Sequence, residues 1–585
     1  MSDISRETLI DALEQIATLL ELKGENPFKI RAYRTGAETV RTYPEDFLQL
    51  ARNNTLTGIK GIGEALRDKL HILASTGSLP FLDKLKAEFP DTIFELFDIN
   101  GLGAKKIAAL YSELGVGSIA DLQRACESGE AARLAGFGEK TTSKLLEAIA
   151  TRASFADTFR IDQVAPAARE ILDFLRGHPD TSRAEVAGSF RRGKETVHDL
   201  DFLAASKNPA AIMEEFIRPP WVHSVMASGP TKTSIRLHSG VQCDLRVVTN
   251  AEFPFALAYF TGSKEHNIQL RARALKQGWT LNEYRFSATG PDSPPVPGGI
   301  HEERDLHRSL GLDYIDPALR EGSGEIEAAE AGTLPRLLES ENLRGTFHNH
   351  TTASDGHATL RQMAEAAMEL GLEYLGIADH SKSSFQANGL DETRLRAQLE
   401  KIRALNAEYA PGFRLFAGSE VDILKDGTLD FPDNLLAELD YTVASVHNVF
   451  TLPEAEMTAR FLRAIANPHV TMLGHLTGRL LLKREAYAIN IPAILDACAA
   501  NGTIIELNAS PWRLDMDWRW WRMAREKGVK CSINPDAHTT HGLQDLWYGL
   551  RTARKGWLTR QDVINTLPLG KIEPALTLKW QHSGI

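Results

Sequence analysis

The stretch Val186-Ala-Gly-Ser-Phe-Arg-Arg-Gly-Lys-Glu-Thr-Val-His-Asp-Leu-Asp201 decides how the middle of the chain folds. Its pattern predicts a strand that runs into Gly188 and Ser189, a short helix, and a second strand that begins near Asp199. Asp199 and Asp201 are two residues apart on that strand, so both carboxylates project from the same face. We expect the backbone N–H groups at Gly188, the Ser189 hydroxyl and the Arg192 guanidinium to bind a triphosphate. A lone Asp-x-Asp pair is usually only a solvated strand end. The order Gly-Ser, Arg, Asp-x-Asp and a later strand Asp is what indicates a nucleotidyl-transfer site.

A third carboxylate stands in a later strand-like run, Val241-Gln-Cys-Asp-Leu-Arg-Val247. Alternation along this run places Gln242, Asp244 and Arg246 on one face and the apolar residues on the other. If the two strands are neighbours, Asp244 completes a set of three carboxylates that can hold two divalent ions. One ion of such a pair activates a sugar hydroxyl while the other stabilises the pyrophosphate that leaves.

The segment Ala258-Tyr-Phe-Thr-Gly-Ser-Lys-Glu-His-Asn267 follows, with Arg271 soon after. We expect a strand or helix to end at Gly262, where the chain turns. Tyr259 and Phe260 are then available to pack on a sugar or a base. The alternative is that both rings belong to the apolar core, and the residues alone do not decide between the two.

The first 155 residues are predicted to form short helices, and residues 5–22 have the apolar spacing of an amphipathic helix. The pattern apolar–Gly–apolar–Gly before a helical stretch occurs three times in this region. Such turns let the backbone approach a phosphate, and the helix that follows offers free N–H groups and its positive dipole end. They bind a nucleic-acid backbone without reading its sequence; the alternative is three plain helical corners. The glycines are Gly61 and Gly63, Gly101 and Gly103, and Gly136 and Gly138, with Arg67, Lys69, Lys105, Lys106, Lys140 and Lys144 close by.

After about residue 341, apolar strand-like runs alternate with helical stretches, the rhythm of an α/β layer or barrel. Seven runs are recognisable, and six of them deliver potential metal ligands at their C-terminal ends, where barrel active sites lie. Imidazoles with carboxylates suit Zn, Mn or Fe, and nine ligands suit two or three ions that clamp a phosphate and activate water. The nine candidates are His348, His350, Asp355, His380, Glu420, His447, His475, Asp536 and His538.

Composition excludes several classes of protein. The 585 residues allow about three or four domains, and 43% apolar with 24% charged residues is typical of globular proteins. No apolar run is long enough to span a bilayer, and the polar start lacks the core of a secretory signal. Four dispersed cysteines argue against disulfides and a cysteine zinc site and favour a cytoplasmic location. The net charge of −11 means that contacts with nucleic acid must be local.

Residues 1–320 resemble the family X DNA polymerases in the order and spacing of four motifs. These are Gly-Ser-x-Arg-Arg-Gly, Asp-x-Asp, the later Asp and Tyr-Phe-Thr-Gly-Ser. The resemblance implies that Asp199, Asp201 and Asp244 are the catalytic metal-binding carboxylates. Ser189 and Arg192 would contact the incoming triphosphate, with Gly188 and Gly262 beside it. Tyr259 and Phe260 would flank the deoxyribose, and Asn267 and Arg271 would approach the nascent base pair.

The same resemblance assigns the helical N-terminal region to DNA binding. The stretch Asn26-Pro-Phe-Lys-Ile-Arg-Ala-Tyr-Arg34, with Lys29 and Tyr33, would contact the 5′ phosphate of a gap. Lys69 falls where some family members have a Schiff-base lysine that removes a 5′ deoxyribose phosphate. The neighbouring lysine of the family motif is Ala65 here, which leaves this lyase activity in doubt.

The last third resembles the PHP (polymerase and histidinol phosphatase) domain, a distorted seven-stranded β/α barrel with a trinuclear metal site whose nine ligand positions are all filled here. A family X polymerase followed by a PHP domain is the arrangement of bacterial family X DNA polymerases. The resemblance implies a 3′→5′ exonuclease, with an abasic-site endonuclease or 3′-phosphatase activity as further options. We expect a multidomain α/β chain: a helical helix-hairpin-helix N-terminal region, a nucleotidyltransferase-type α+β palm and thumb, and the C-terminal PHP barrel. The expected boundaries are 1–90 for DNA-end binding, 91–155 for the helix-hairpin-helix fingers, 156–250 for the palm, 251–320 for the thumb, 321–340 for a linker and 341–585 for the barrel.

The resulting hypothesis is a cytoplasmic, monomeric polymerase that fills gaps in base excision repair. It would use gapped or primer–template DNA and dNTPs, with Mg²⁺ or Mn²⁺ at the polymerase site, two or three Zn²⁺, Mn²⁺ or Fe ions in the barrel, and no membrane. Alternatives are a phosphoesterase tethered to DNA by a catalytically silent polymerase core, a non-enzymatic DNA-end scaffold, and an untemplated nucleotidyltransferase.

Overall fold

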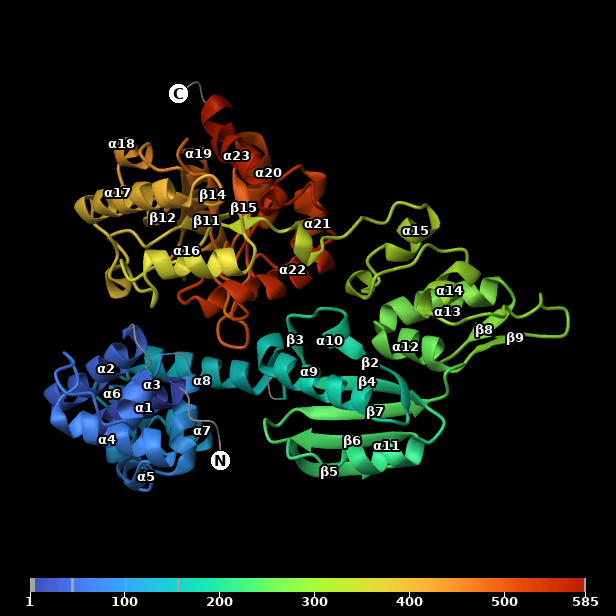
Figure 1. Cartoon of the computed structure of the whole chain (residues 1–585), viewed down its shortest axis with the longest axis horizontal. Coiled ribbons are helices and arrows are strands. Elements are labelled where there is room, and N and C mark those ends of the chain that lie inside the picture. Colours follow the sequence, from blue (N-terminus) through green and yellow to red (C-terminus); the bar gives the residue numbers. More distant parts are fainter. Residues whose placement is uncertain (1–5, 44–46, 100, 155–156, 583–585) are drawn as a thin grey trace. The chain divides into compact units, whose positions relative to one another are not determined.

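The computed structural model describes residues 6–43, 47–99, 101–154 and 157–582, and it divides into two compact units, residues 1–156 and residues 157–585. Figure 1 shows the elements of each unit. Among the described residues, no helix combines the length and the apolarity that crossing a bilayer would need. All four cysteines are buried and free, as the sequence predicts.

The first unit is helical, and its core confirms the predicted periodicity. Leu9, Leu13, Ile16 and Leu20 lie along one face of the first helix and are almost completely buried, because apolar residues three and four apart share a helix face. The three Gly-x-Gly turns lead directly into α4, α6 and α8. The helices are α1 (Arg6–Leu22), α2 (Pro27–Thr42), α3 (Phe47–Arg52), α4 (Glu64–Thr76), α5 (Pro80–Lys86), α6 (Ala104–Leu114), α7 (Ile119–Glu127) and α8 (Glu139–Ser154), with 3-10 turns η1 (Asp91–Asp98) and η2 (Ala131–Arg133).

The second unit begins with a five-stranded sheet in the order β2-β4-β7-β6-β5. β4 and β7 run parallel, and the other neighbours are antiparallel. The buried faces of these strands pack on α9 and α11 around Ile171, Phe202, Phe216 and Leu245. Its elements are β1 (Phe159–Arg160), α9 (Ile161–Gly177), β2 (Thr181–Val186), α10 (Gly188–Arg191), β3 (Thr196–Val197), β4 (Asp199–Ser206), α11 (Pro209–Phe216), β5 (Val222–Ser228), β6 (Lys232–Leu237) and β7 (Gln242–Val248).

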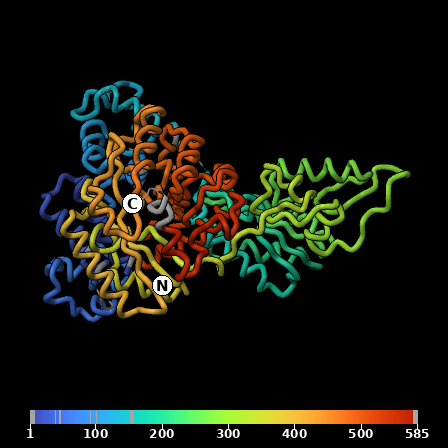
Figure 2. The backbone as a smooth tube through the Cα atoms, turned by 90° about the horizontal axis from the view of Figure 1, so that it is seen from above, coloured from blue at the N-terminus to red at the C-terminus, as the bar shows by residue number. Residues whose placement is uncertain are grey.

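A smaller helical layer follows the sheet. Figures 1 and 2 show the hairpin of β8 and β9 beside α13. The expected turn at Gly262 separates two helices, so the helix interpretation of the segment before it is confirmed. Residues 321–340 are predicted to be a linker that is partly helical, and residues 325–330 form a helix whose Ile326 and Ala329 pack in the apolar cluster of this layer. The elements are α12 (Phe253–Thr261), α13 (Lys264–Lys276), β8 (Trp279–Leu281), β9 (Phe286–Ala288), α14 (Glu303–Ser309), η3 (Pro317–Leu319) and α15 (Glu325–Glu330).

Seven parallel strands in the order β10 to β16 make the last part, with helices around them (Figure 1). A parallel bridge between Asn349 and Ala537 joins the chain after the first strand to the chain after the last, so the sheet is a nearly closed barrel. The strands are buried on both faces, which explains why they read as apolar runs. They are β10 (Gly345–Thr346), β11 (Tyr374–Ile377), β12 (Arg414–Asp422), β13 (Tyr441–Ser445), β14 (Met472–Leu473), β15 (Ile504–Asn508) and β16 (Cys531–Asn534). The helices are α16 (Leu360–Glu369), α17 (Glu392–Tyr409), α18 (Asp433–Leu436), α19 (Glu454–Ala466), α20 (Ile491–Asn501), α21 (Trp518–Glu526), α22 (Leu546–Lys555) and α23 (Leu569–His582), with 3-10 turns η4 (Ser340–Asn342), η5 (Phe385–Ala387), η6 (His541–Asp545) and η7 (Ile564–Thr566).

Candidate functional site

The parallel pairing of β4 and β7 brings the three predicted aspartates together. Asp201 lies opposite Asp244 in the register, and Asp199 lies opposite Gln242. Because side chains two apart on a strand share a face, all three carboxylates project from the same side of the sheet. Gln242 Nε2 donates to Asp244 Oδ1 over 3.1 Å, and Lys232 Nζ lies 2.5 Å from Asp244 Oδ2.

The electrostatics of this cluster favour a bound cation. Burial, with the charges of Asp199 and Asp244, raises the pKa of Asp201 to about 7. Burial and Asp244 also raise the pKa of Asp199. Burial acts in the same direction on Asp244, but hydrogen bonds from Lys232, Ser234 and Gln242 outweigh it and lower the pKa of that carboxyl. Carboxylates that repel one another in a half-buried site are stabilised by a divalent ion, so this set fits a metal site.

Gly188 at the start of α10 has no room for a side chain. A Cβ placed there would lie 2.3 Å from Asp201 Oδ2, and the residue has φ +60°. Glycine alone therefore allows this turn to approach the carboxylates so closely. The Ser189 hydroxyl has no hydrogen-bond partner in the described part of the chain, which leaves it available to a ligand.

Arg192 lies just after this turn and is held at two of its three nitrogens. Its Nε donates to Glu321 Oε1 over 2.9 Å, and its Nη1 donates to the carbonyl of Thr261. No described residue accepts a hydrogen bond from its Nη2. The Arg192 guanidinium is thus oriented by the protein and keeps one donor group for a phosphate oxygen.

The predicted nucleotide contacts on α12 and α13 also lie together. Tyr259 and Phe260 pack edge to face with ring centroids 5.1 Å apart, and both are half-buried. Asn267 Nδ2 donates to the Tyr259 carbonyl over 2.7 Å, and Arg271 Nε donates to the Asn267 carbonyl. Tyr259, Asn267 and Arg271 line one small hollow. Their roles toward a nucleotide stay predictions.

The barrel gathers all nine predicted ligands at the C-terminal ends of its strands. Glu420 at the end of β12 lies among four imidazoles. Its oxygens are 2.9 Å from His380 Nδ1, 2.9 Å from His475 Nε2, 3.1 Å from His447 Nε2 and 3.3 Å from His348 Nε2.

The remaining ligands surround His350. His350 Nε2 is 3.1 Å from Asp536 Oδ1, and its Nδ1 is 3.9 Å from Asp355 Oδ1. His538 Nε2 lies 3.4 Å from Asp355 Oδ1. Three overlapping subsets of these ligands have atoms close enough to hold an ion, and His475 belongs to none of them. The subsets are His350, Asp355, His380 and His538; His348, His350 and Asp536; and His380, Glu420 and His447.

Unpartnered buried atoms show that the set fits metal ions. His348 Nε2, His350 Nδ1, His380 Nδ1 and Glu420 Oε2 are buried and have no hydrogen-bond partner. Buried polar atoms are nearly always paired, so four such atoms in one cluster, none in hydrogen-bonding geometry, indicate ligand positions. Burial, with the neighbouring imidazoles, lowers the pKa of His350 to about 4, which keeps it neutral and able to coordinate.

Two further carboxylates orient these imidazoles, and sequence reasoning missed both. Glu506 Oε2 is 2.6 Å from His348 Nδ1, and Asp422 hydrogen-bonds His447 Nδ1. Partners of this kind fix the ring that binds the metal and raise its basicity. Arg513 is also nearby, with Nε 3.6 Å from Asp536 Oδ2, and it adds positive charge. The signal for Glu506 was a charged residue inside the apolar run 503–508, the one run without a predicted ligand.

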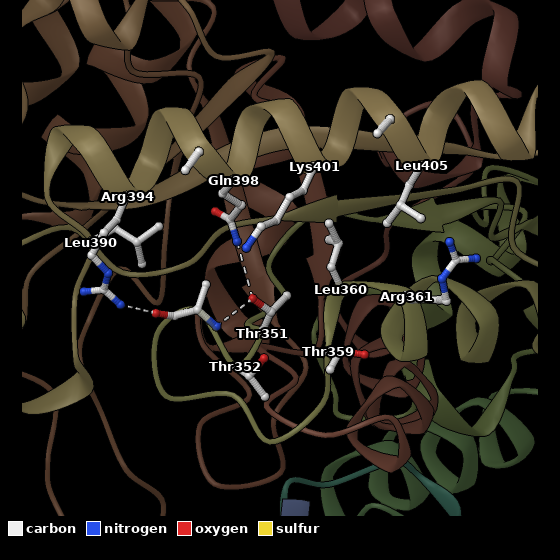
Figure 3. Close-up of a pocket in the computed structure, with 13 residues that line it drawn as sticks. Thr351, Thr352, Thr359, Leu360, Arg361, Leu390, Arg394, Gln398, Lys401 and Leu405 are labelled. Atoms are coloured by element: carbon white, nitrogen blue, oxygen red, sulfur yellow. Dashed lines mark hydrogen bonds between the residues drawn. The ribbon is translucent and has the colours of Figure 1, made fainter. Parts of the chain in front are cut away.

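A cavity of about 570 Å³ adjoins the ligand set. Figure 3 shows Gln398 of α17 donating to Thr351, which directly follows His350, and Arg394 donating to the Ala353 carbonyl. Arg361 and Lys401 add positive charge to the lining. Most of the lining is apolar, and the Arg361 guanidinium is paired with Glu408 over 2.7 Å.

In the first unit the three turns have the conformation that needs glycine. Gly61, Gly101 and Gly136 have φ between +85° and +93°, and Gly63, Gly103 and Gly138 directly precede α4, α6 and α8. A Cβ at Gly101 or Gly136 would meet open space, so these turns are accessible to a phosphate backbone.

Tyr33 differs from the other predicted DNA contacts. Its side chain is 4% exposed and stacks on Phe81, whose ring also lies 4.7 Å beneath Lys69 Nζ. We therefore no longer expect the Tyr33 ring to touch DNA; it supports Lys69 through Phe81. Burial, together with nearby Lys29, lowers the pKa of Lys69.

Family models match four segments of the chain. They are a helix-hairpin-helix domain over residues 5–79, a SAM-like helix-hairpin-helix tandem over residues 93–151, a DNA polymerase beta thumb over residues 256–321 and a PHP domain over residues 346–510. These segments do not include the three aspartates of the sheet or the pair Asp536 and His538. Their assignment as metal ligands therefore rests on their positions in the sheet and the barrel.

Relatives cover both the whole chain and the barrel alone. The chain is 38% identical over 573 residues to a Bacillus subtilis (strain 168) protein named DNA polymerase/3′-5′ exonuclease PolX, which spans 98% of this chain and 99% of that protein. A probable phosphatase of Thermoanaerobacter sp. (strain X514) is 30% identical over 250 residues, or 40% of this chain and 96% of that protein. A probable phosphatase of Clostridium acetobutylicum is 29% identical over 203 residues, or 33% of this chain and 78% of that protein.

Proposed function

The chain belongs to the family X DNA polymerases that carry a C-terminal PHP domain, and from this membership we propose how its two sites divide the work. The protein is a DNA-directed DNA polymerase and a 3′→5′ exonuclease. We assign synthesis to the site on β4 and β7 and 3′-end hydrolysis to the barrel. The same proposal includes gap filling in base excision repair, a cytoplasmic location and a monomeric state. It also includes the domain boundaries given above.

In synthesis, Asp199, Asp201 and Asp244 would hold Mg²⁺ or Mn²⁺. Bound there, the ions supply the positive charge that activates the primer 3′ hydroxyl and stabilises the leaving pyrophosphate. The Ser189 hydroxyl and Arg192 Nη2, which have no partner among the described residues, bind the triphosphate of the dNTP. Gly188 keeps this turn close to the carboxylates. Tyr259 and Phe260 pack against the deoxyribose, and Asn267 and Arg271 lie next to them.

In hydrolysis, the nine barrel ligands would hold two or three Zn²⁺, Mn²⁺ or Fe ions. Such ions supply an activated water and neutralise the phosphate that is attacked. Glu506 and Asp422 hold His348 and His447 in position. Arg513 lies beside Asp536, where its guanidinium can bind a phosphate oxygen. A 3′-phosphatase reaction at the same ligands is a second candidate, and the similarity of the barrel to probable phosphatases supports it.

The glycine turns of the first unit would hold the DNA backbone. Open space around Gly101, Gly103, Gly136 and Gly138, with Lys105 close by, supports backbone contacts that do not depend on sequence. Gly61, Gly63, Lys29 and Lys69 would contact the 5′ side of a gap. Lyase chemistry at Lys69 stays a prediction; borohydride trapping on a 5′-deoxyribose-phosphate substrate tests it, and absence of an adduct would exclude it.

One observation supports the proposal most strongly: three carboxylates gather on one face of the sheet, and nine imidazoles and carboxylates gather at the strand ends of the barrel, eight of them in groups close enough to hold an ion. The test is a labelled primer that leaves a one-nucleotide gap, incubated with Mn²⁺, with and without dNTPs. We expect extension when dNTPs are present and 3′ shortening when they are absent. Shortening alone would indicate a phosphoesterase on a silent polymerase core, and product that is independent of the template base would indicate untemplated transfer.

A further inference from the structure

The barrel covers the triphosphate-binding turn of the polymerase. Arg551 of α22 donates to the carbonyl of Phe190, and its guanidinium lies 5.1 Å over the Phe190 ring. Lys555, at the end of the same helix, donates to the carbonyl of Arg192 over 3.2 Å. A barrel helix thus contacts both residues that flank Arg191, directly after Gly188 and Ser189.

Lys555 also reaches the side chain of Arg192 through Glu321. Glu321 Oε1 accepts hydrogen bonds from Arg192 Nε and from Lys555 Nζ, and Lys194 Nζ lies 3.6 Å from Glu321 Oε2. The Lys555 side chain is completely buried and that of Glu321 is 9% exposed. Three cations share one carboxylate here, with little water to screen them.

Three basic side chains gather around the single carboxylate of Glu321. Burial, with Lys194 and Arg192 nearby, lowers the pKa of Lys555 to about 8, while Glu321 acts in the opposite direction. Trp518 of α21 closes the cluster from the barrel side, with Lys555 Nζ 4.6 Å and Lys194 Nζ 5.6 Å from its ring. Its indole N–H donates to Glu195 over 3.1 Å. Glu321 is therefore the carboxylate that couples the barrel lysine to Arg192.

We propose that Lys555 of the nuclease barrel is a positioning residue for DNA synthesis, which acts through Glu321 to hold Arg192 in place for the triphosphate of the incoming dNTP. By sharing Glu321, Lys555 reduces the pull of that carboxylate on Arg192 and leaves the guanidinium able to bind phosphate. Without Lys555, Glu321 would pair more tightly with Arg192 and would repel the triphosphate. The inference rests on the proposed function of the β4 and β7 site.

The test compares dNTP kinetics of the full-length protein with those of Lys555→Met, which removes the ammonium and keeps the length of the side chain. Gap filling by Lys555→Met should show a KM for dNTP about tenfold higher, with kcat nearly unchanged, because Glu321 is no longer shared and pairs more tightly with Arg192. Its 3′→5′ exonuclease rate on single-stranded DNA should equal that of the unaltered protein. Lys571→Met, an exposed lysine of the same barrel, is the matched control and should change neither.

A double-mutant cycle separates this mechanism from a general structural effect. In a Glu321→Gln background, Lys555→Met should change the KM for dNTP by at most about twofold, because the residue acts through that carboxylate. Lys555→Gln keeps an N–H donor but no charge and should also raise the KM, which covers the case in which Lys555→Met does not fold.

Three results would overturn the inference. One is an unchanged KM for dNTP in Lys555→Met and Lys555→Gln, and another is an equal effect of Lys555→Met with and without Glu321. A parallel loss of kcat, exonuclease rate and melting temperature would assign Lys555 a structural role only. Absence of dNTP incorporation by the unaltered protein would instead overturn the polymerase function on which the inference rests.

Discussion

At Gly188 a single missing atom determines whether the polymerase site can form. A Cβ at this position would lie 2.3 Å from Asp201 Oδ2, and φ is +60°. We predict that Gly188→Ala lowers dNTP incorporation about 5- to 150-fold, because either the turn or the carboxylate must move and such strain costs about 1–3 kcal/mol. Primer extension measures the effect, and the exonuclease rate should be unchanged.

The matched control is Gly290→Ala, since Gly290 has no positive φ and an added Cβ would meet open space. This variant should incorporate dNTPs at the unaltered rate. Equal activity of Gly188→Ala and Gly290→Ala would contradict the placement of the triphosphate turn against Asp201.

The pKa of Asp201 predicts how synthesis depends on pH. In the metal-free site burial and the neighbouring carboxylates raise that pKa to about 7. Below pH 7 the carboxyl is protonated, so an ion must displace a proton in order to bind; above pH 7 it need not. We predict that the half-saturating Mg²⁺ concentration is constant above pH 7 and rises by up to about tenfold per pH unit below it.

This dependence is measured by dNTP incorporation with Asp536→Ala protein, so that the product is not degraded. Asp536 belongs to the barrel set, and its loss leaves the carboxylates on β4 and β7 intact. The same half-saturating concentration at pH 6 and at pH 8 would show that Asp201 is already ionised without metal.

At the scale of single residues, the sequence predicted side chains whose role depends on their own strand. Asp199, Asp201 and Asp244 meet because alternation and parallel pairing are regular. It could not predict Glu506 beside His348, or Glu321 between Arg192 and Lys555, because those roles depend on contacts between distant parts of the chain. It also assigned Tyr33 to DNA, although the ring is buried against Phe81.

At the scale of elements, the alternation of strands and helices in residues 341–585 predicted the barrel correctly, since parallel strands buried on both faces leave a clear apolar run. The residues 321–340 were harder to interpret. A short stretch rich in Glu, Ala and Gly has no strong helical periodicity, and α15 is stabilised by the packing of Ile326 and Ala329. Tertiary contacts, rather than local propensity, decide such a segment.

The strand β15 supplies a prediction at this scale, because it contributes orientation rather than a ligand. Glu506, the middle residue of β15, has Oε2 2.6 Å from His348 Nδ1. We predict that Glu506→Gln lowers the affinity of the barrel for metal about 10- to 100-fold, as loss of such partners does elsewhere. Metal analysis after dialysis against a weak chelator measures the loss, and dNTP incorporation should be unaffected.

The control for β15 is Glu526→Gln on α21, an exposed carboxylate paired with Arg522. It should retain the metal content of the unaltered protein. Equal metal retention by Glu506→Gln would show that His348 needs no carboxylate to hold its ring.

At the scale of the whole molecule, one chain is assigned two reactions at a DNA 3′ end: synthesis, which lengthens the strand, and hydrolysis, which shortens it. Net charge does not explain binding, because the chain carries −11. Local features do: glycine turns, a triphosphate turn and clustered ligands, each formed by a few residues. The contacts of α21 and α22 with Arg192 and Glu195 show that the barrel packs against the segment between β2 and β4.

The measurement that tests the central claim most directly assays both activities in two variants on the same gapped primer. Asp199→Ala combined with Asp201→Ala should abolish extension and leave 3′ shortening at the unaltered rate. His348→Ala should abolish shortening and leave extension intact, because the two ligand sets share no residue. If either variant, folded as judged by its melting curve, lost both activities equally, the assignment of synthesis and hydrolysis to two separate metal sites would be wrong.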